Sequence, residues 1–181
     1  MSTTRLVTLD DAPVLAELFR VNREFLAPFE PIRDDDFFTA DGQRTVIEES
    51  LDRYGQGSTV PHVILNDAGQ VAGRINLNSI VRGPFLSCAL GYWVSAGENG
   101  RGLATTAVGA MKRMAFAELG LHRIEAGTLV QNVRSQRVLE RNGFVRFGLA
   151  PAYLHIAGRW QDHILWQVVA PDPSSTRSTG G

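Results

Sequence analysis

Two short segments of the chain carry residue types at spacings that suit chemistry on a phosphate-bearing ligand. The first is Gly97-Glu98-Asn99-Gly100-Arg101-Gly102, which lies between an apolar stretch ending at Val94 and a helical pattern beginning at Leu103. A glycine-rich loop that opens a helix points free backbone N–H groups and the positive end of the helix dipole at one place. Glycine also lets the backbone approach a ligand closely because it has no Cβ. This junction predicts either an anion site or a simple turn of the chain.

The glycine loop matches neither of the two common nucleotide-binding loops. A dinucleotide fingerprint requires a third glycine where Thr105 stands, and it follows the first strand of a parallel unit. A P-loop requires Gly-Lys-Ser/Thr, and Lys112 is the single lysine of the chain. A different phosphate ligand is therefore required if the loop binds an anion.

The second segment, Asn132-Val133-Arg134-Ser135 followed by Asn142-Gly143-Phe144, indicates which ligand this is. Together with Gly100-x-Gly102 it resembles the motifs of the GNAT acyltransferases, in their ribosomal-protein N-acetyltransferase (RimJ/RimL) form. The segments at residues 25–31, 91–94, 123–125 and 158–163 are similar to that subfamily too. Each motif is weak alone, but the ordered set covers about residues 3 to 170 at the expected spacings.

The resemblance implies that acetyl-CoA binds at the glycine loop and at the start of the next helical segment. The residues it implies for cosubstrate binding are Val94, Ser95, Gly97, Asn99, Gly100, Arg101, Gly102, Leu103, Ala104, Asn132 and Ser135. The chain departs from the family at Gly97, where a Gln or Arg usually opens the loop, so we expect Arg101 to supply charge instead. Some relatives carry at Leu139 a tyrosine that reprotonates the thiolate, and leucine cannot do this.

Three residues are candidates for catalysis, and each also has a plain structural reading. Ser135 is expected to relay a proton to the CoA thiolate, or is simply a first-turn serine. Asn132 is expected to bind the pantetheine amide, or is a helix N-cap, which asparagine favours. Glu125 is a strand carboxylate beside the expected CoA gap, or an outward-facing solvated side chain. The identity of the general base stays open, and Glu98, Asp162 and His163 are further candidates for it.

The acceptor site is expected on the side of the sheet opposite to CoA, between two stretches around Phe29 and Trp160. Both stretches read as irregular and contain aromatic and proline residues. The residues predicted to bind the acceptor are Phe29, Tyr92, Tyr153, Trp160 and Asp162. An acidic loop, Asp34-Asp35-Asp36, suits a cationic acceptor if it borders this cleft.

The elements that position these residues belong to an α+β fold. The resemblance implies a GNAT fold with a mixed, mostly antiparallel sheet of about seven strands, split by a CoA cleft and flanked by about four helices. The patterns predict strands near residues 5–9, 60–65, 71–77, 85–94, 122–130, 144–149 and 164–169. They predict helices near residues 10–22, 45–54, 103–119 and 132–141, with Val133, Val138 and Leu139 buried in the last.

Composition excludes several classes of protein. The chain of 181 residues has a formal net charge of -1, which argues against nucleic-acid binding. Cys88 is the single cysteine, and the four histidines have no ligand spacing, so we expect no disulfide and no metal. No apolar run is long enough for a membrane span. We expect one domain at residues 1–170, a disordered polar tail at 171–181, and a cytoplasmic location.

The function predicted is acetyl transfer from acetyl-CoA to a primary amine, most simply the N-terminal α-amine of a protein or peptide. Acylation of a small amine, such as an antibiotic or polyamine, stays open. A third alternative, a module that binds acyl-CoA without catalysing a reaction, also stays open, because the sequence does not identify a general base. The choice between acetyl and other acyl donors, and between monomer and homodimer, also stays open.

Overall fold

The sheet runs in the order β1-β2-β3-β4-β5-β7-β6 in the computed structural model, which describes residues 3–171. The strands are β1 (Thr4–Leu6), β2 (Val60–Leu65), β3 (Val71–Val81), β4 (Ser87–Val94), β5 (Arg123–Leu129), β6 (Val145–Ile156) and β7 (Arg159–Val169). The helices are α1 (Ala12–Val21), α2 (Arg23–Leu26), α3 (Ala40–Gly55), α4 (Leu103–Arg113) and α5 (Val133–Arg141). The mixed, mostly antiparallel seven-stranded sheet is confirmed, with five α-helices in the described part against about four expected.

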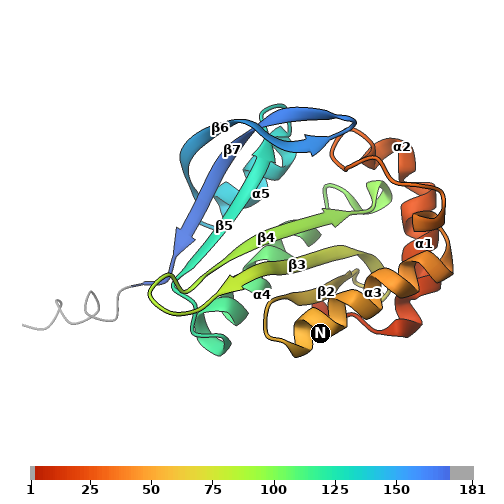
Figure 1. Cartoon of the computed structure of the whole chain (residues 1–181), viewed down its shortest axis with the longest axis horizontal. Coiled ribbons are helices and arrows are strands. Elements are labelled where there is room, and N and C mark those ends of the chain that lie inside the picture. Colours follow the sequence, from red (N-terminus) through yellow and green to blue (C-terminus); the bar gives the residue numbers. More distant parts are fainter. Residues whose placement is uncertain (1–2, 172–181) are drawn as a thin grey trace, which may run out of the picture.

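One strand pair breaks the regularity of the sheet. Among the described strands only β4 and β5 run parallel, and they pair at just three positions, Ser87 to Ala89 with Arg123 to Glu125. Beyond these positions the two strands diverge (Figure 1). From Leu90 to Val94, no described strand pairs with the β5-facing edge of β4. The sheet is therefore two half-sheets joined at one end, with a wedge between them.

Helices cover both faces and bury two separate cores. On one face, α1 and α3 pack through Leu15 and Ile47 against Val63 of β2. On the other face, α4 and α5 pack through Met111 and Leu139 against the strands. All five side chains are fully buried, so truncating any of them to alanine should cost about 2–5 kcal/mol. No helix among residues 3–171 is both long and apolar enough to cross a lipid bilayer.

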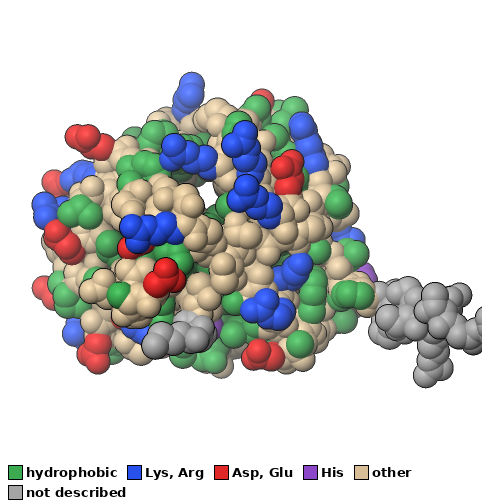
Figure 2. Space-filling view, turned by 180° about the vertical axis from the view of Figure 1, so that it is seen from behind, with side chains coloured by type: hydrophobic (Ala, Val, Ile, Leu, Met, Phe, Trp, Pro, Cys, Tyr) green, Lys and Arg blue, Asp and Glu red, His purple; other side chains and the backbone are tan. Residues whose placement is uncertain are grey.

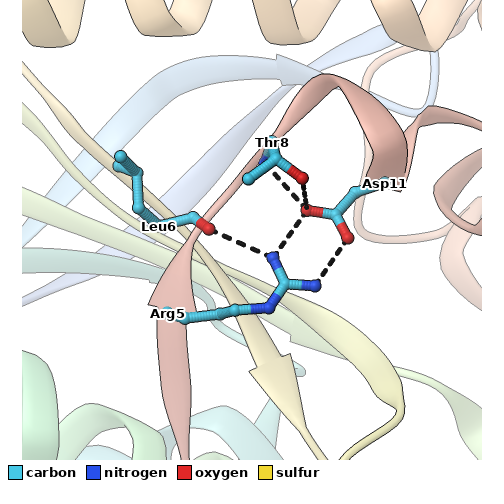
Figure 3. A network of polar contacts seen from close by, with 4 residues as sticks. All are labelled: Arg5, Leu6, Thr8 and Asp11. Carbon is cyan, nitrogen blue, oxygen red and sulfur yellow. Dashed lines mark hydrogen bonds and ion pairs between the residues drawn. The ribbon is translucent and has the colours of Figure 1, made fainter.

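An ion pair fastens β1 to the start of α1 (Figure 3). The Arg5 guanidinium donates to both oxygens of the buried Asp11 carboxylate, at 2.8 and 2.7 Å, and also to the carbonyl of Leu6 at 3.1 Å. The backbone N–H and the hydroxyl of Thr8 donate to the same carboxylate. Burial raises the pKa of Asp11, but these hydrogen bonds outweigh burial and hold the pKa below its usual value.

The structure corrects several predicted boundaries. The first strand ends at Leu6, because a 3-10 turn at Leu9–Asp11 leads directly into α1. Helix α3 begins at Ala40 rather than near residue 45, and the Thr39 side chain caps it by accepting from the Gly42 N–H at 3.0 Å. Its first turn, Ala-Asp-Gly-Gln, lacks the apolar spacing that marks a helix. After Arg113, α4 widens into a π-helical turn, Met114–Glu118.

Two further expectations are wrong near the end of the chain. The stretch around Trp160 is not irregular, because β6 and β7 form a long antiparallel hairpin that turns at Ala157 and Gly158. Val133 is not buried but 49% exposed, since the apolar face of α5 is set by Leu139. The predicted tail lies outside the described residues from residue 172 onward.

Candidate active site

A cavity of about 450 Å³ occupies the wedge between β4 and β5. On one side it is bounded by the Phe25–Glu30 segment, which comprises the end of α2 and the residues after it, and on the other by α5 and the loop that precedes it. The strand residues that line it run from Leu90 to Val94 and from Ala126 to Leu129. Because it passes through the gap in the sheet, this cavity can admit one ligand from each face.

A second cavity, of about 480 Å³, lies at the start of α4 and adjoins the first. Gly100 and Gly102 line it with φ of +81° and +78°, a conformation that favours glycine. Gly102 is the N-cap of α4, so no side chain caps the first N–H groups of the helix, and the first residues of α4 line this cavity. The geometry of an anion site is therefore present.

Three arginines of α5 supply the positive charge at this second cavity. Arg134, Arg137 and Arg141 line it from the side opposite to the glycine loop. Seen from behind, the molecule shows Lys and Arg side chains gathered around a hollow (Figure 2). Arg101, which was expected to supply charge, instead pairs with Glu98 at 3.2 Å and does not line the described cavities. The α5 arginines were missed, although their spacing along one helix face was readable.

The structure brings together most of the residues implied for cosubstrate binding. Those lining one or both cavities are Val94, Asn99, Gly100, Gly102, Leu103, Ala104, Asn132 and Ser135. Ser95 and Gly97 do not line them in the described structure. The Ser95 hydroxyl and the Ala96 N–H are held by the buried Asn22 side chain of the α1–α2 junction, at 3.0 and 2.8 Å. Asn22 therefore fixes the end of β4 rather than touching the cavity.

Asn132 and Ser135 lie at the start of α5, as expected if Asn132 is the helix N-cap and Ser135 lies in the first turn. The Asn132 Oδ1 accepts a hydrogen bond from the Ser135 N–H at 3.2 Å, which makes Asn132 the N-cap. Its amide nitrogen makes no hydrogen bond to any described residue and lies at the cavity wall. One asparagine can thus cap the helix and still offer a donor to a ligand carbonyl.

The Ser135 side chain has a partner that the sequence did not indicate. The Tyr92 hydroxyl of β4 lies 2.8 Å from Ser135 Oγ, and it also lies 3.2 Å from the Ser135 carbonyl oxygen. Burial raises the pKa of Tyr92 to about 12, against a smaller lowering by Ser135. The phenol therefore stays protonated near neutral pH, and two hydroxyl groups meet at the cavity wall.

Glu125 is not placed for catalysis. It lies at the paired end of β5, opposite Ala89, and its carboxylate is 4.0 Å from Arg123. The cavity begins one residue later, at Ala126. The half-exposed position of Glu125 matches the interpretation that its side chain points outward to solvent. Side chains alternate along a strand, and its neighbours Ile124 and Ala126 are buried.

Two further side chains that can accept a proton line the main cavity. Glu30 lies at its α2 end, and burial raises the pKa of this carboxyl group, against weaker effects of Arg33 and Arg74. His163 of β7 is 3% exposed, and its Nδ1 lies 3.0 Å from the Gln161 carbonyl oxygen. That contact favours the tautomer with the proton on Nδ1 and a lone pair on Nε2. Sequence reasoning missed Glu30, because only the fold brings residue 30 to the gap.

The predicted acceptor residues divide into two groups. Phe29 and Tyr92 line the main cavity, whereas Tyr153, Trp160 and Asp162 lie on the β6–β7 hairpin outside its described lining. Trp160 is 65% exposed, and Asp162 accepts a hydrogen bond from the Ala152 N–H at 2.8 Å. The acidic loop also lies outside the lining, and its Asp35 pairs with Arg23.

The hairpin nevertheless contacts the segment that bounds the main cavity. Its tip reaches the segment that follows α2, where the Ala157 N–H donates to the Glu30 carbonyl at 3.0 Å (Figure 1). A Cβ on Gly158 would lie 2.9 Å from the Ile32 side chain, so the contact is close. The two stretches expected to wall the acceptor site therefore meet.

Neither a nucleophilic cysteine nor a metal cluster is evident in the described part of the chain. Cys88 is buried, and burial together with Glu125 raises the pKa of its thiol to about 12. No three His, Cys, Asp or Glu side chains among residues 3–171 come together as metal ligands would.

Comparison with known proteins identifies the family. The family described as Acetyltransferase (GNAT) domain matches residues 3–145. A probable N-acetyltransferase, YjcK, of Bacillus subtilis is 36% identical over 169 residues, covering 93% of both chains. The [ribosomal protein uS5]-alanine N-acetyltransferase of Escherichia coli is also 36% identical over 169 residues, covering 93% of this chain and 87% of that protein. The structure of Mycobacterium smegmatis RimJ in complex with CoA-disulfide superposes with a TM-score of 0.90 at 28% identity, covering 98% of this chain and 84% of RimJ.

With its split sheet, its glycine loop and these matches, the chain belongs to the GNAT family of acetyltransferases. It is an acetyl-CoA-dependent N-acetyltransferase of the RimJ/RimL-like kind. The resemblance inferred from the motifs is thereby confirmed, and so is the enzyme class.

Proposed function

We propose that this enzyme transfers the acetyl group of acetyl-CoA to the N-terminal α-amine of a protein. The observation that carries the proposal is the cavity through the split sheet, which is bounded by the glycine-loop side and by the Phe25–Glu30 segment. Such a passage lets a thioester and an amine approach one another from opposite faces. The 36% identity to an enzyme named for acetylating a ribosomal protein alanine supports a protein acceptor.

The residues present fit acetyl-CoA. The N–H groups at the start of α4 and the three arginines of α5 suit its phosphates, because both favour negative charge. The Asn132 amide nitrogen can donate to an amide carbonyl of the pantetheine arm. The unpaired edge of β4 can hydrogen-bond the amides of the same arm, as if the arm were an added strand. When bound, acetyl-CoA would supply the acetyl group as a thioester.

We assign the stabilisation of the oxyanion to one backbone donor, the Val94 N–H. The Ser95 N–H donates to the carbonyl of Ala72 in β3, at 2.8 Å, and is therefore not free. Backbone N–H groups alternate in direction along a strand, so the Val94 N–H points to the other side, into the wedge. Loss of one such donor typically costs about 10²–10³ in rate.

The incoming ammonium must lose a proton, and Glu30 and His163 are the two groups that line the cavity and can accept it. Glu30 is the stronger candidate, because it lies at the acceptor end and burial shifts its pKa upward, toward the working range of a base. His163, with its lone pair on Nε2, is the alternative. We assign the first role to Glu30.

The departing thiolate takes a proton from the pair formed by Tyr92 and Ser135. Ser135 Oγ donates its proton to the thiolate and takes one from the Tyr92 hydroxyl, and a proton from solvent restores Tyr92, so that no phenolate remains. A thiol of pKa about 8.5 needs little help to leave. This arrangement makes a tyrosine at position 139 unnecessary, since a phenol reaches the same cavity from β4.

The test is turnover with a panel of acceptors. Purified protein and acetyl-CoA are incubated with peptides bearing a free N-terminal alanine or serine, with the same peptides blocked at the α-amine, and with polyamines and aminoglycosides. We expect CoA release only with the free α-amine peptides. Turnover confined to small amines would replace the protein acceptor by a small one. Binding of acetyl-CoA without turnover on any amine would contradict the proposed role and favour a binding module.

The cytoplasmic location stays a prediction.

A further inference from the structure

A third cavity, of about 400 Å³, lies on the α1/α3 face of the sheet and adjoins the main one. We call it the β3 pocket, after the strand that carries Arg74 and Asn76 into it. It shares a wall with the main cavity, formed by Glu30 and by Gly91, Tyr92 and Trp93 of β4. An acceptor whose amine reaches the main cavity can therefore extend into the β3 pocket.

The polar side of β3 lines this pocket. Arg74 and Asn76 alternate with Ile75 and Leu77, which are fully buried in the core on the opposite face. Across the sheet, Arg74 lies opposite Trp93 and Asn76 lies opposite Gly91. Gly91 carries no side chain beside Asn76, and the nearest atom to a Cβ built there would be the Asn78 Nδ2, at 3.7 Å. The two polar side chains are thus held rigidly on a central strand.

Arg74 is a buried cation whose hydrogen-bonding groups are unused. It is 7% exposed, yet no hydrogen bond or ion pair joins its guanidinium to any residue between 3 and 171, and its Nε is fully enclosed. The Oδ1 of Asn76 is likewise buried without a partner in the described structure. Arginine stays protonated in proteins, and a buried charge without a partner is strongly unfavourable. Such a pair of unused groups is expected where a ligand completes the interaction.

Nearby carboxylates do not neutralise Arg74, because each has another arginine as its partner. Glu30 lies 3.7 Å from Arg33, and Glu49 lies 3.9 Å from Arg53. Asp11 is bound by Arg5. Asp11, Glu30 and Arg53 influence Arg74 only through space. The pocket therefore keeps one positive charge in excess, and a carboxylate is the ligand group that would balance it.

We propose that Arg74 binds a carboxylate of the acceptor while Asn76 Oδ1 accepts a backbone N–H of the same chain. The preferred acceptor is then a chain end with Asp or Glu at the second or third position. This inference rests on the proposed function, since it assumes that an amine-bearing chain occupies the main cavity. A short peptide with a free C-terminal carboxylate could supply the same group.

The test compares matched peptides, all amidated at the C-terminus, with Glu or Gln at the second or third position. For the wild-type enzyme we expect kcat/KM to be roughly 10-fold or more higher with Glu at one of these positions. Arg74→Met should reduce this ratio to near one and leave the KM of acetyl-CoA unchanged. Arg44→Met, which removes an exposed charge of α3 outside the cavities, should keep the ratio. A Gln tripeptide with a free C-terminus shows whether a terminal carboxylate serves equally.

Stability separates recognition from a structural role. Removing an unpaired buried charge should leave the Tm of Arg74→Met unchanged or raise it, whereas loss of a structural contact would lower it. If that variant does not fold, Arg74→Lys keeps the charge but loses the planar fork, and it should lose most of the Glu preference. Equal rates for Glu and Gln peptides in the wild type would overturn this inference while leaving amine acetylation intact.

A binding measurement keeps the two proposals apart if turnover is absent. The N-acetylated Glu peptide, which is the expected product, should bind the wild-type enzyme with CoA present more tightly than the Gln product does. Arg74→Met should remove that difference. Binding without turnover would contradict the proposed catalysis alone, and equal binding of both products would contradict the carboxylate site.

Discussion

The Tyr92 hydroxyl lies 2.8 Å from Ser135 Oγ, which joins β4 to α5 across the wedge of the sheet. The contact connects residues 43 positions apart, and both residues line the main cavity. It lets a proton pass between the two hydroxyl groups. The catalytic role proposed for these residues therefore makes them one unit rather than two independent contributors.

Removing either hydroxyl should slow the chemical step. Tyr92→Phe and Ser135→Ala are each expected to lower kcat by roughly 10- to 100-fold with little change in the KM of acetyl-CoA. The double variant should lose less than the product of the single losses, because both changes break the same contact. Steady-state kinetics measures this, and Tyr54→Phe, on the exposed surface of α3, is the matched control. Full additivity would show that the two hydroxyls act separately.

The α5 arginines should act on cosubstrate binding alone. Arg134→Ala, Arg137→Ala and Arg141→Ala are each expected to raise the KM of acetyl-CoA by roughly 3- to 10-fold, because each removes a charge from the phosphate site. The kcat should change little. Added salt should weaken acetyl-CoA binding to the wild type more than to the variants. Arg20→Ala, in an exposed pair with Glu17 on α1, provides the control. An unchanged KM in all three variants would place the phosphates elsewhere.

A pH profile should identify the general base. The base must be unprotonated, so kcat/KM should fall as the pH drops through the pKa of Glu30, which burial raises above its usual value. Glu30→Gln should lower the rate and abolish this acid limb while acetyl-CoA still binds. His163→Gln should keep the limb. The reverse result, in which only His163→Gln abolishes it, would transfer the role to His163.

His62 should make folding stability depend on pH. Burial, with a smaller effect of Arg5, lowers the pKa of His62 from 6.5 to about 4. The unfolded chain binds this proton below about pH 6.5, whereas the folded protein does so only near pH 4. The free energy of unfolding should therefore fall as the pH drops from about 6.5 to about 4, by up to about 3 kcal/mol from this residue.

Urea unfolding at several pH values measures that effect. His62→Gln should flatten the acid side of the stability profile, and His155→Gln, with an exposed side chain, should not. Identical profiles for wild type and His62→Gln would mean that the imidazole titrates alike in both states.

The predicted domain boundary can be tested by truncation. The last described backbone hydrogen bond runs from the Ala170 N–H to the His122 carbonyl at 2.8 Å. A chain that ends at Ala170 should keep its Tm and its turnover, because the residues removed are polar and offer no apolar anchor. A large loss of either property would place the boundary beyond residue 170.

The parts of the site that the sequence predicted are those formed by neighbours in the chain. The glycine loop and the Asn132 cap depend on local backbone geometry. The residue types at Gly100, Gly102 and Asn132 indicate that geometry in the sequence itself. The strand order from β2 to β4 follows from hairpins, which are also local. These features can be read without knowledge of the tertiary fold.

The parts that the sequence did not predict depend on contacts between distant segments. Ser95 is drawn away from the cavity by Asn22, 73 positions earlier, and no local pattern announces that contact. Glu30 becomes part of the site only because the α2 segment meets the wedge. Arg74 interrupts an apolar strand, which was a readable sign, but its lack of a partner emerges only when every neighbouring carboxylate is assigned.

The short pairing of β4 with β5 divides recognition between two kinds of chemistry. On the donor side, the pantetheine arm is proposed to pair with main-chain groups exposed by an interrupted ladder, and main chain is the same whatever side chains a sequence carries. The proposed acceptor side is made of side chains, such as Phe29, Glu30 and Arg74. Substitutions on the proposed acceptor side can therefore change which amine the enzyme acetylates, while the main-chain contacts to the acetyl donor stay the same.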